Sequence, residues 1–387
     1  MTRPTILAIA LALTCLTSAA VACLWDYDTL AMERQRFPNA LELITGKFLR
    51  HSPEFYEWRV QDRERRLQAD PANASLYDDL GVAYLKLGNH AKAIEVMLQK
   101  TKAVADSYET HANLGTFYIY AGQLEPSVEE IDRAIAINPD AHFGRELYQR
   151  HLVRYLMSKQ RDGTTQFPLD SSERYDEMRP VGFATYVLKA QVTPATAEAE
   201  TAELQKATQG VLGMMRFANH ASPLLLEALG DLLLSGRNRD VDAKQLATRA
   251  YLKASYESQD DAARATYRKM AEESLRLQTI DEDTSDELSL AALEKEFLGE
   301  LAEAQTWYQA VEADERAWIS SGKNPDEEFT RKYYSEPAVS DASAEPVSSL
   351  PRKLWPWPWL IIVPAFVALV VWIRRRSRLT DSAHPVT

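Results

Sequence analysis

The chain has 387 residues, 26% of them charged, and a formal net charge of −12 at pH 7. Residues 351–387 carry six basic residues and one Asp, so the rest of the chain is more acidic than the total. An acidic body repels phosphate backbones, which excludes nucleic acid as a partner. Abundant Ala and Leu with only 14 Gly predict one elongated helical array or two helical domains.

Residues 1–22 have the features of an export signal: a basic start, an apolar core too short to span a bilayer, and small residues before a cleavage point. Cys23 follows at once and resembles the lipidated Cys of lipoproteins, although Ala20 stands where Leu is usual. Because Cys15 leaves with the signal, no internal disulfide can form. Cys23 is then acylated, unmodified or paired with another chain.

Two helices are expected before the clearest pattern of the chain. The first covers residues 37–48, and His51-Ser52-Pro53 ends it. Ser52 and Pro53 are a good helix cap and first-turn pair, so the second helix covers residues 53–68.

Residues 74–107 and 108–141 are two tandem copies of one 34-residue pattern. Each copy predicts two helices at helical apolar spacing, over residues 74–87 and 91–104, and over 108–120 and 125–137. Gly81 lets the partner helix approach closely, and Gly88 ends the first helix in a left-handed cap. Such a unit cannot bury its own apolar face and must stack on a neighbour.

These copies resemble the tetratricopeptide repeat (TPR) family. The matching residues are Tyr77, Leu80, Gly81, Tyr84, Ala93 and Met97 in the first copy, and Leu114, Gly115, Tyr118, Ile131, Ala134 and Pro139 in the second. The copies depart from the family pattern at Lys100, Ala105, His111 and Ser127. The resemblance implies an all-α fold, a TPR-like helical-hairpin solenoid.

The chain after the repeats is also expected to be helical. Residues 143–158 lack the Leu-Gly signature and are expected to cap the solenoid, which completes an N-terminal helical region over residues 23–160. A C-terminal helical region follows over residues 161–335. Its expected parts are a loop at 160–180, helices at 181–190 and 194–218, a TPR-like pair at 224–256 containing Leu229-Gly230, and helices at 260–278 and 288–320.

The C-terminal end predicts a membrane anchor. Residues 336–353 are rich in Ser, Ala, Pro and acids and are expected to be a disordered linker. Residues 354–373 carry no charge, and at ~1.5 Å rise per residue they reach roughly 30 Å, one hydrocarbon core. Arginines follow in residues 374–387, which the positive-inside rule places in the cytoplasm. The expected location is the cell membrane, single-pass, with the body periplasmic.

Two runs, residues 23–30 and 140–146, also resemble a group of uncharacterised exported, membrane-anchored bacterial TPR proteins. This resemblance implies no activity. Tests for catalytic motifs are negative: Gly46-Lys47 lacks the other residues of a phosphate loop, and Asp281 to Ala292 lacks the Gly and Glu of a calcium loop. The chain is therefore expected not to be an enzyme, with no catalytic, cofactor-binding or metal-binding residues.

In the TPR family the concave surface is formed mainly by the first helix of each repeat. The resemblance places these residues there as protein-binding candidates: Asp78, Val82, Leu85, Lys86, Asn113, Thr116 and Tyr120. Asp78 and Val82 differ from the family's clamp for a chaperone tail. A mixed apolar and acidic surface suits a peptide or helix with some positive charge, or is simply a solvated face.

The leading hypothesis is a membrane-tethered extracytoplasmic TPR scaffold that mediates protein–protein interaction through this concave surface. Its partner would be an unidentified protein or peptide. Two alternatives stay open: an enzyme of unrecognised type with a pocket between the two helical regions, and a purely structural spacer.

Overall fold

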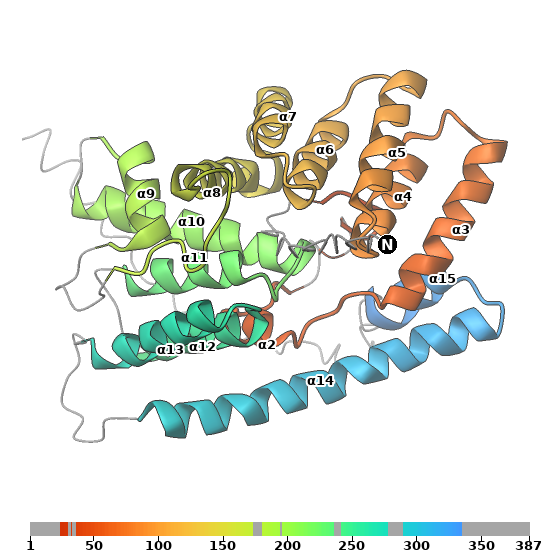
Figure 1. Ribbon diagram of the computed structural model, residues 1–387. Coiled ribbons are helices and arrows are strands. Elements are labelled where there is room, and N and C mark those ends of the chain that lie inside the picture. The colour runs from red at the N-terminus through yellow and green to blue at the C-terminus, as the bar shows by residue number, and fades with distance from the viewer. Residues whose placement is uncertain are drawn as a thin grey trace, which may run out of the picture. The chain divides into compact units, whose positions relative to one another are not determined.

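The structure is a computed structural model that describes residues 24–29, 32, 36–172, 180–193, 196–235, 241–277 and 289–334. Within these ranges the chain is helical, and the only extended pairing is an isolated bridge between Arg161 and Thr164. The all-α prediction is therefore confirmed for the described part of the chain (Figure 1).

The helices follow one another with short connections. Before and through the repeats they are α2 (Ala40–Thr45), α3 (Pro53–Ala69), α4 (Ala74–Lys86), α5 (His90–Ala103), α6 (Tyr108–Tyr120) and α7 (Leu124–Ile137). After the repeats they are η1 (Ala141–Gly144), α8 (Arg145–Lys159), α9 (Gly182–Gln191), α10 (Ala197–Phe217), α11 (Pro223–Leu234), α12 (Val241–Glu257), α13 (Asp261–Arg276), α14 (Leu290–Ser320), α15 (Pro325–Phe329) and η2 (Thr330–Tyr334).

The two repeat copies form the hairpins α4/α5 and α6/α7 at the predicted positions. Gly88 follows α4 with φ of 77°, the left-handed conformation expected there. A Cβ on Gly81 would lie 2.9 Å from the ring of Phe117, and one on Gly115 would lie 2.7 Å from Ile131. The close helix approach predicted from the Leu-Gly pairs is therefore confirmed, because a larger residue would force the helices apart.

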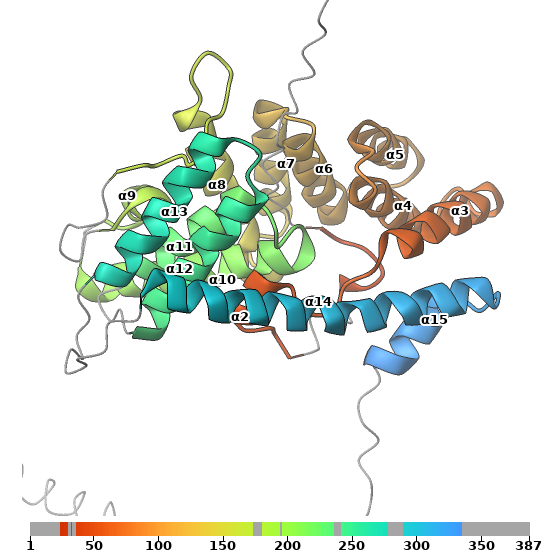
Figure 2. The same ribbon diagram turned by 60° about the horizontal axis from the view of Figure 1, so that its bottom comes forward.

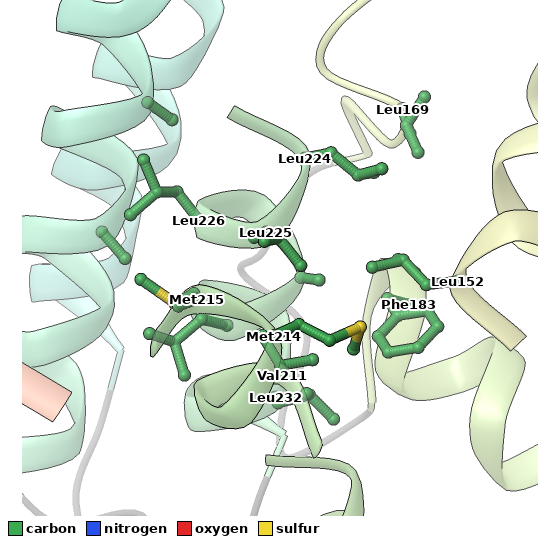
Figure 3. Packing of buried hydrophobic residues seen from close by; sticks show 14 of the residues in the cluster. Leu152, Leu169, Phe183, Val211, Met214, Met215, Leu224, Leu225, Leu226 and Leu232 are labelled. Atoms are coloured by element: carbon green, nitrogen blue, oxygen red, sulfur yellow. The ribbon is translucent and has the colours of Figure 1, made fainter. Parts of the chain in front are cut away.

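Helices α11 and α12 form a third hairpin with the same kind of contact. A Cβ on Gly230 would lie 2.5 Å from the ring of Tyr251. Helix α13 packs next on α12. The side chains buried among α8 to α13 belong to the largest apolar cluster of the described residues (Figure 3). Its members include Leu152, Phe183, Val211, Met214 and Leu225.

Two expectations from the sequence are wrong in detail. The helix expected over 37–48 is reduced to α2, because Asn39 forms a capping box with Glu42 and Gly46 ends the helix at φ 83°. The segment expected to cap the solenoid is α8, which packs on α7 and also on α9 and α10. It continues the array instead of ending it, since later helices cover its other side.

The long helix α14 returns to the beginning of the described chain. It contacts α12 and α13 as well as α3 (Figure 2). After it, α15 and the π-helical turn η2 were not indicated by the sequence pattern; they pack Phe329 and Tyr334 in one cluster with Trp318. This return brings α15 against α3, which precedes the repeats.

None of the helices in the described ranges has both the length and the apolar character needed to cross a bilayer. The predicted export signal (1–22), linker (336–353), membrane span (354–373) and tail (374–387) lie outside the described residues and stay predictions.

Candidate functional site

The seven predicted protein-binding residues lie on α4 and α6, the first helices of the two repeat hairpins. We call the surface they form the α4–α6 surface. Asp78, Val82, Leu85, Asn113 and Thr116 are buried, and Lys86 and Tyr120 are half-buried. The surface is therefore not open, because other parts of the same chain cover it. That it binds another protein stays a prediction.

Residues 24–29, the N-terminal segment, lie on this surface and are held by their main chain. The N–H of Trp25 donates to Oδ1 of Asn113 at 2.9 Å, and Nδ2 of Asn113 donates to the carbonyl oxygen of Trp25 at 3.0 Å. The N–H of Tyr27 donates to Oδ1 of Asp79 at 2.7 Å. In peptide recognition, such main-chain hydrogen bonds supply affinity, and side-chain pockets supply specificity.

The first two side chains of the N-terminal segment occupy different environments. Leu24 is buried in an apolar cluster with residues of α4, α5 and α6, among them Val82. The indole of Trp25 stacks on the imidazole of His142 with ring centroids 5.2 Å apart, and meets the ring of Tyr108 edge-on at 6.4 Å. The two runs noted in the sequence, 23–30 and 140–146, thus meet in space through Trp25 and His142.

The two aspartates of the N-terminal segment enter a buried ion network. Arg59 of α3 is fully buried; its Nη1 contacts Asp26 at 3.2 Å, and its Nη2 contacts Asp28 at 2.6 Å. The same Nη2 contacts Asp326 of α15 at 2.6 Å. A buried charge is tolerated only when it is paired. One guanidinium therefore fixes both the N-terminal segment and α15 to α3.

His51 extends this network to α14. Its Nε2 lies 2.9 Å from Asp28, and its Nδ1 contacts Glu315. Burial by itself would lower the pKa of His51, but the two carboxylates outweigh burial and raise it to about 9. Burial likewise opposes ionisation of Asp28, but Arg59 and His51 hold the pKa of that carboxyl well below its usual range. His51 is therefore charged at neutral pH.

The acidic residues of α4 are already paired within the chain. Lys100 donates to both carboxylate oxygens of Asp78, at 2.7 and 2.8 Å, and Arg63 donates to Asp79 at 2.8 Å. Burial raises the pKa of Asp78 to about 7, although Lys100 opposes it. The segment that lies on this surface is itself acidic, unlike the positively charged peptide expected from the sequence.

Lys86 and Thr116 connect the α4–α6 surface to later helices. Lys86 donates to the carbonyl oxygens of Phe217 and Ala218, at 2.9 and 2.6 Å, where α10 ends. Burial lowers the pKa of Lys86 to about 8. The hydroxyl of Thr116 accepts a hydrogen bond from Gln149 of α8 at 3.0 Å. Both residues predicted to contact a partner thus contact the chain itself.

Two departures from the repeat pattern have a structural reason. Lys100 is the partner of buried Asp78, and His111 lies 2.5 Å from Glu130 across the second hairpin. Each polar departure is therefore satisfied inside its own hairpin or the next.

Sequence reasoning missed Arg59, His51, Asp26 and Asp28. One signal was present: Arg59 and Arg63 are four residues apart, so they share one face of a helix that is otherwise aromatic. Their partners could not be named from the sequence, because Asp326 is 267 residues away from Arg59.

A cavity of about 320 Å³ lies where the two predicted helical regions meet. Residues from α2, α10 and α14 line it, including Glu42, Lys47, Arg216 and Trp307. Glu42 is paired with Arg36, which holds its pKa below the usual range against partial burial. No metal-binding group of three or more His, Cys, Asp or Glu occurs in the described part of the chain.

Comparison with known proteins bears on the repeats. The tetratricopeptide repeat family model matches residues 74–100 and 108–141. The first match ends at Lys100, the first departure from the pattern. Comparison with curated proteins gives no match. Residues 74–141, which form the hairpins α4/α5 and α6/α7, are therefore tetratricopeptide repeats.

Proposed function

We propose that this protein is a membrane-tethered scaffold that binds a segment of another protein through the α4–α6 surface, outside the cytoplasm. Tetratricopeptide repeats in general mediate protein–protein interaction. The observation that carries the proposal is Asn113, which binds both the N–H and the carbonyl group of one residue of an extended segment. This contact supports a surface suited to main-chain recognition.

The tethering and the location rest on the sequence. An uncharged run over residues 354–373, followed by arginines, is typical of a single-pass span with a cytoplasmic tail. Residues 1–22 favour export of everything before that span. The helical body would then stand outside the cytoplasm, close to the membrane.

The test is capture of the partner by the full chain, solubilised from native membranes in mild detergent. Asn113→Ala should lose a partner that the unchanged chain captures, because both main-chain hydrogen bonds of the surface disappear. Gln123→Ala is the matched control: it also removes a carboxamide, but from an exposed turn. A partner that Asn113→Ala still captures would place the interaction elsewhere.

A further inference from the structure

We infer that the N-terminal segment is a displaceable internal ligand of the α4–α6 surface. The surface beneath it then accepts, from another chain, an extended peptide of the pattern apolar–aromatic–acid–any–acid. This inference rests on the proposed function and specifies its ligand. In this state the protein is autoinhibited, because its own copy of the motif occupies the surface.

The N-terminal segment is held as a bound peptide would be held. Its contacts are with α3, α4, α6 and η1, at sequence separations of 31 to 117 residues; the longest, between Trp25 and His142, follows from their numbering. Its own backbone hydrogen bonds form only one turn, from Thr29 to Asp26 and from Met32 to Asp28. No strand or long helix of its own fixes it in place, so tertiary contacts alone hold it.

The pattern of the ligand follows from the exposure and contacts of each position. Leu24 requires an apolar residue, and Trp25 requires an aromatic one that can stack on His142. Asp26 and Asp28 each reach Arg59. Tyr27 is 52% exposed and contributes its main-chain N–H, so this position tolerates any side chain.

The buried cations explain why the ligand must be acidic. When the N-terminal segment leaves, His51 and Arg59 lose Asp28 inside the protein. A competing peptide restores their partner only if it carries a carboxylate at the same position, since an unpaired buried charge is strongly unfavourable. A neutral or basic peptide would bind without this compensation and would be rejected.

Competition with a tethered segment sets the expected affinities. A segment joined to its site by a short connection acts at an effective concentration of about millimolar. A peptide in solution therefore binds the unchanged protein weakly, because the surface is rarely vacant. Weakening the N-terminal segment removes this competition and raises the apparent affinity, while the surface itself stays intact.

The experiment titrates a fluorescent peptide with the sequence of residues 24–30 against the full chain in detergent, followed by anisotropy. Trp25→Ala should bind it at least about tenfold more tightly than the unchanged chain. Tyr27→Ala is the matched control in the same segment and should bind as weakly as the unchanged chain. Asn113→Ala added to Trp25→Ala should abolish binding, as should a peptide with Asn in place of both Asp residues.

The inference is overturned if a folded Trp25→Ala variant gains no affinity for the peptide, or if the Asn-substituted peptide binds equally well. Far-UV circular dichroism establishes folding. If Trp25→Ala does not fold, amide hydrogen exchange of the unchanged chain decides. Excess peptide should speed exchange at Trp25 and Tyr27, whereas unchanged rates would refute displacement. A native partner captured by a chain that ignores the peptide would refute this inference and leave the scaffold proposal standing.

Discussion

Arg59 offers the sharpest test of how the described chain is closed. Its guanidinium is fully buried and contacts Asp28 and Asp326, which come from opposite ends of the described residues. We predict that Arg59→Met, which keeps the volume but removes the charge, destabilises the protein strongly. The two carboxylates would stay buried and would lose their shared partner.

The magnitude follows from the contacts that remain. Removing one partner of a buried ion pair costs about 3–5 kcal/mol. Asp28 keeps His51 and Asp326 keeps Arg63, so both carboxylates stay partly compensated. We therefore expect the lower end of that range, a loss of about 3 kcal/mol in the free energy of unfolding.

The assay is urea unfolding of the full chain in detergent, followed by far-UV circular dichroism. Arg65→Met on the same helix is the control: its side chain is 72% exposed, so the change should cost less than about 0.5 kcal/mol. The deficit of Arg59→Met should also shrink as the pH falls from about 7 to about 4, because the variant no longer has a cation that disfavours protonation of these carboxylates. A loss below about 1 kcal/mol, or a deficit that does not depend on pH, would refute the reasoning.

Three further predictions concern other parts of the chain. The pKa of His51 is raised from 6.5 to about 9, so its contribution to stability is fully present below pH 6.5 and disappears as the pH rises through about 9. The unchanged chain should lose more unfolding free energy than His51→Gln between about pH 6.5 and about pH 9.5, and equal losses would contradict this. Gly230→Ala should cost about 1–3 kcal/mol because its Cβ would overlap Tyr251, whereas Gly299→Ala on α14, with nothing within 4 Å, should be neutral or slightly stabilising; thermal unfolding compares the two. A reporter enzyme fused after Thr387 should be active only in the cytoplasm, and an exported reporter would rule out the predicted span.

The helices and their pairing into hairpins were predictable because their causes are local. Ser52 caps α3 and Gly88 follows α4, each as the chemistry of that position requires. The Leu-Gly pairs marked where a second helix approaches, at Gly81, Gly115 and Gly230. Periodicity also located the seven residues of the α4–α6 surface on two neighbouring helices.

The sequence by itself thus determined the helical class, the repeat pair and the residues of the candidate surface. Only the tertiary structure decided that this surface is covered by residues 24–29 and that Arg59 joins that segment to α15. The physical reason is that a buried charge requires a partner at a particular place, and no local pattern states which distant carboxylate will be there. Asp28 and Asp326 are 298 positions apart by their numbering, yet both contact Nη2 of one arginine, because the return of α14 brings them together.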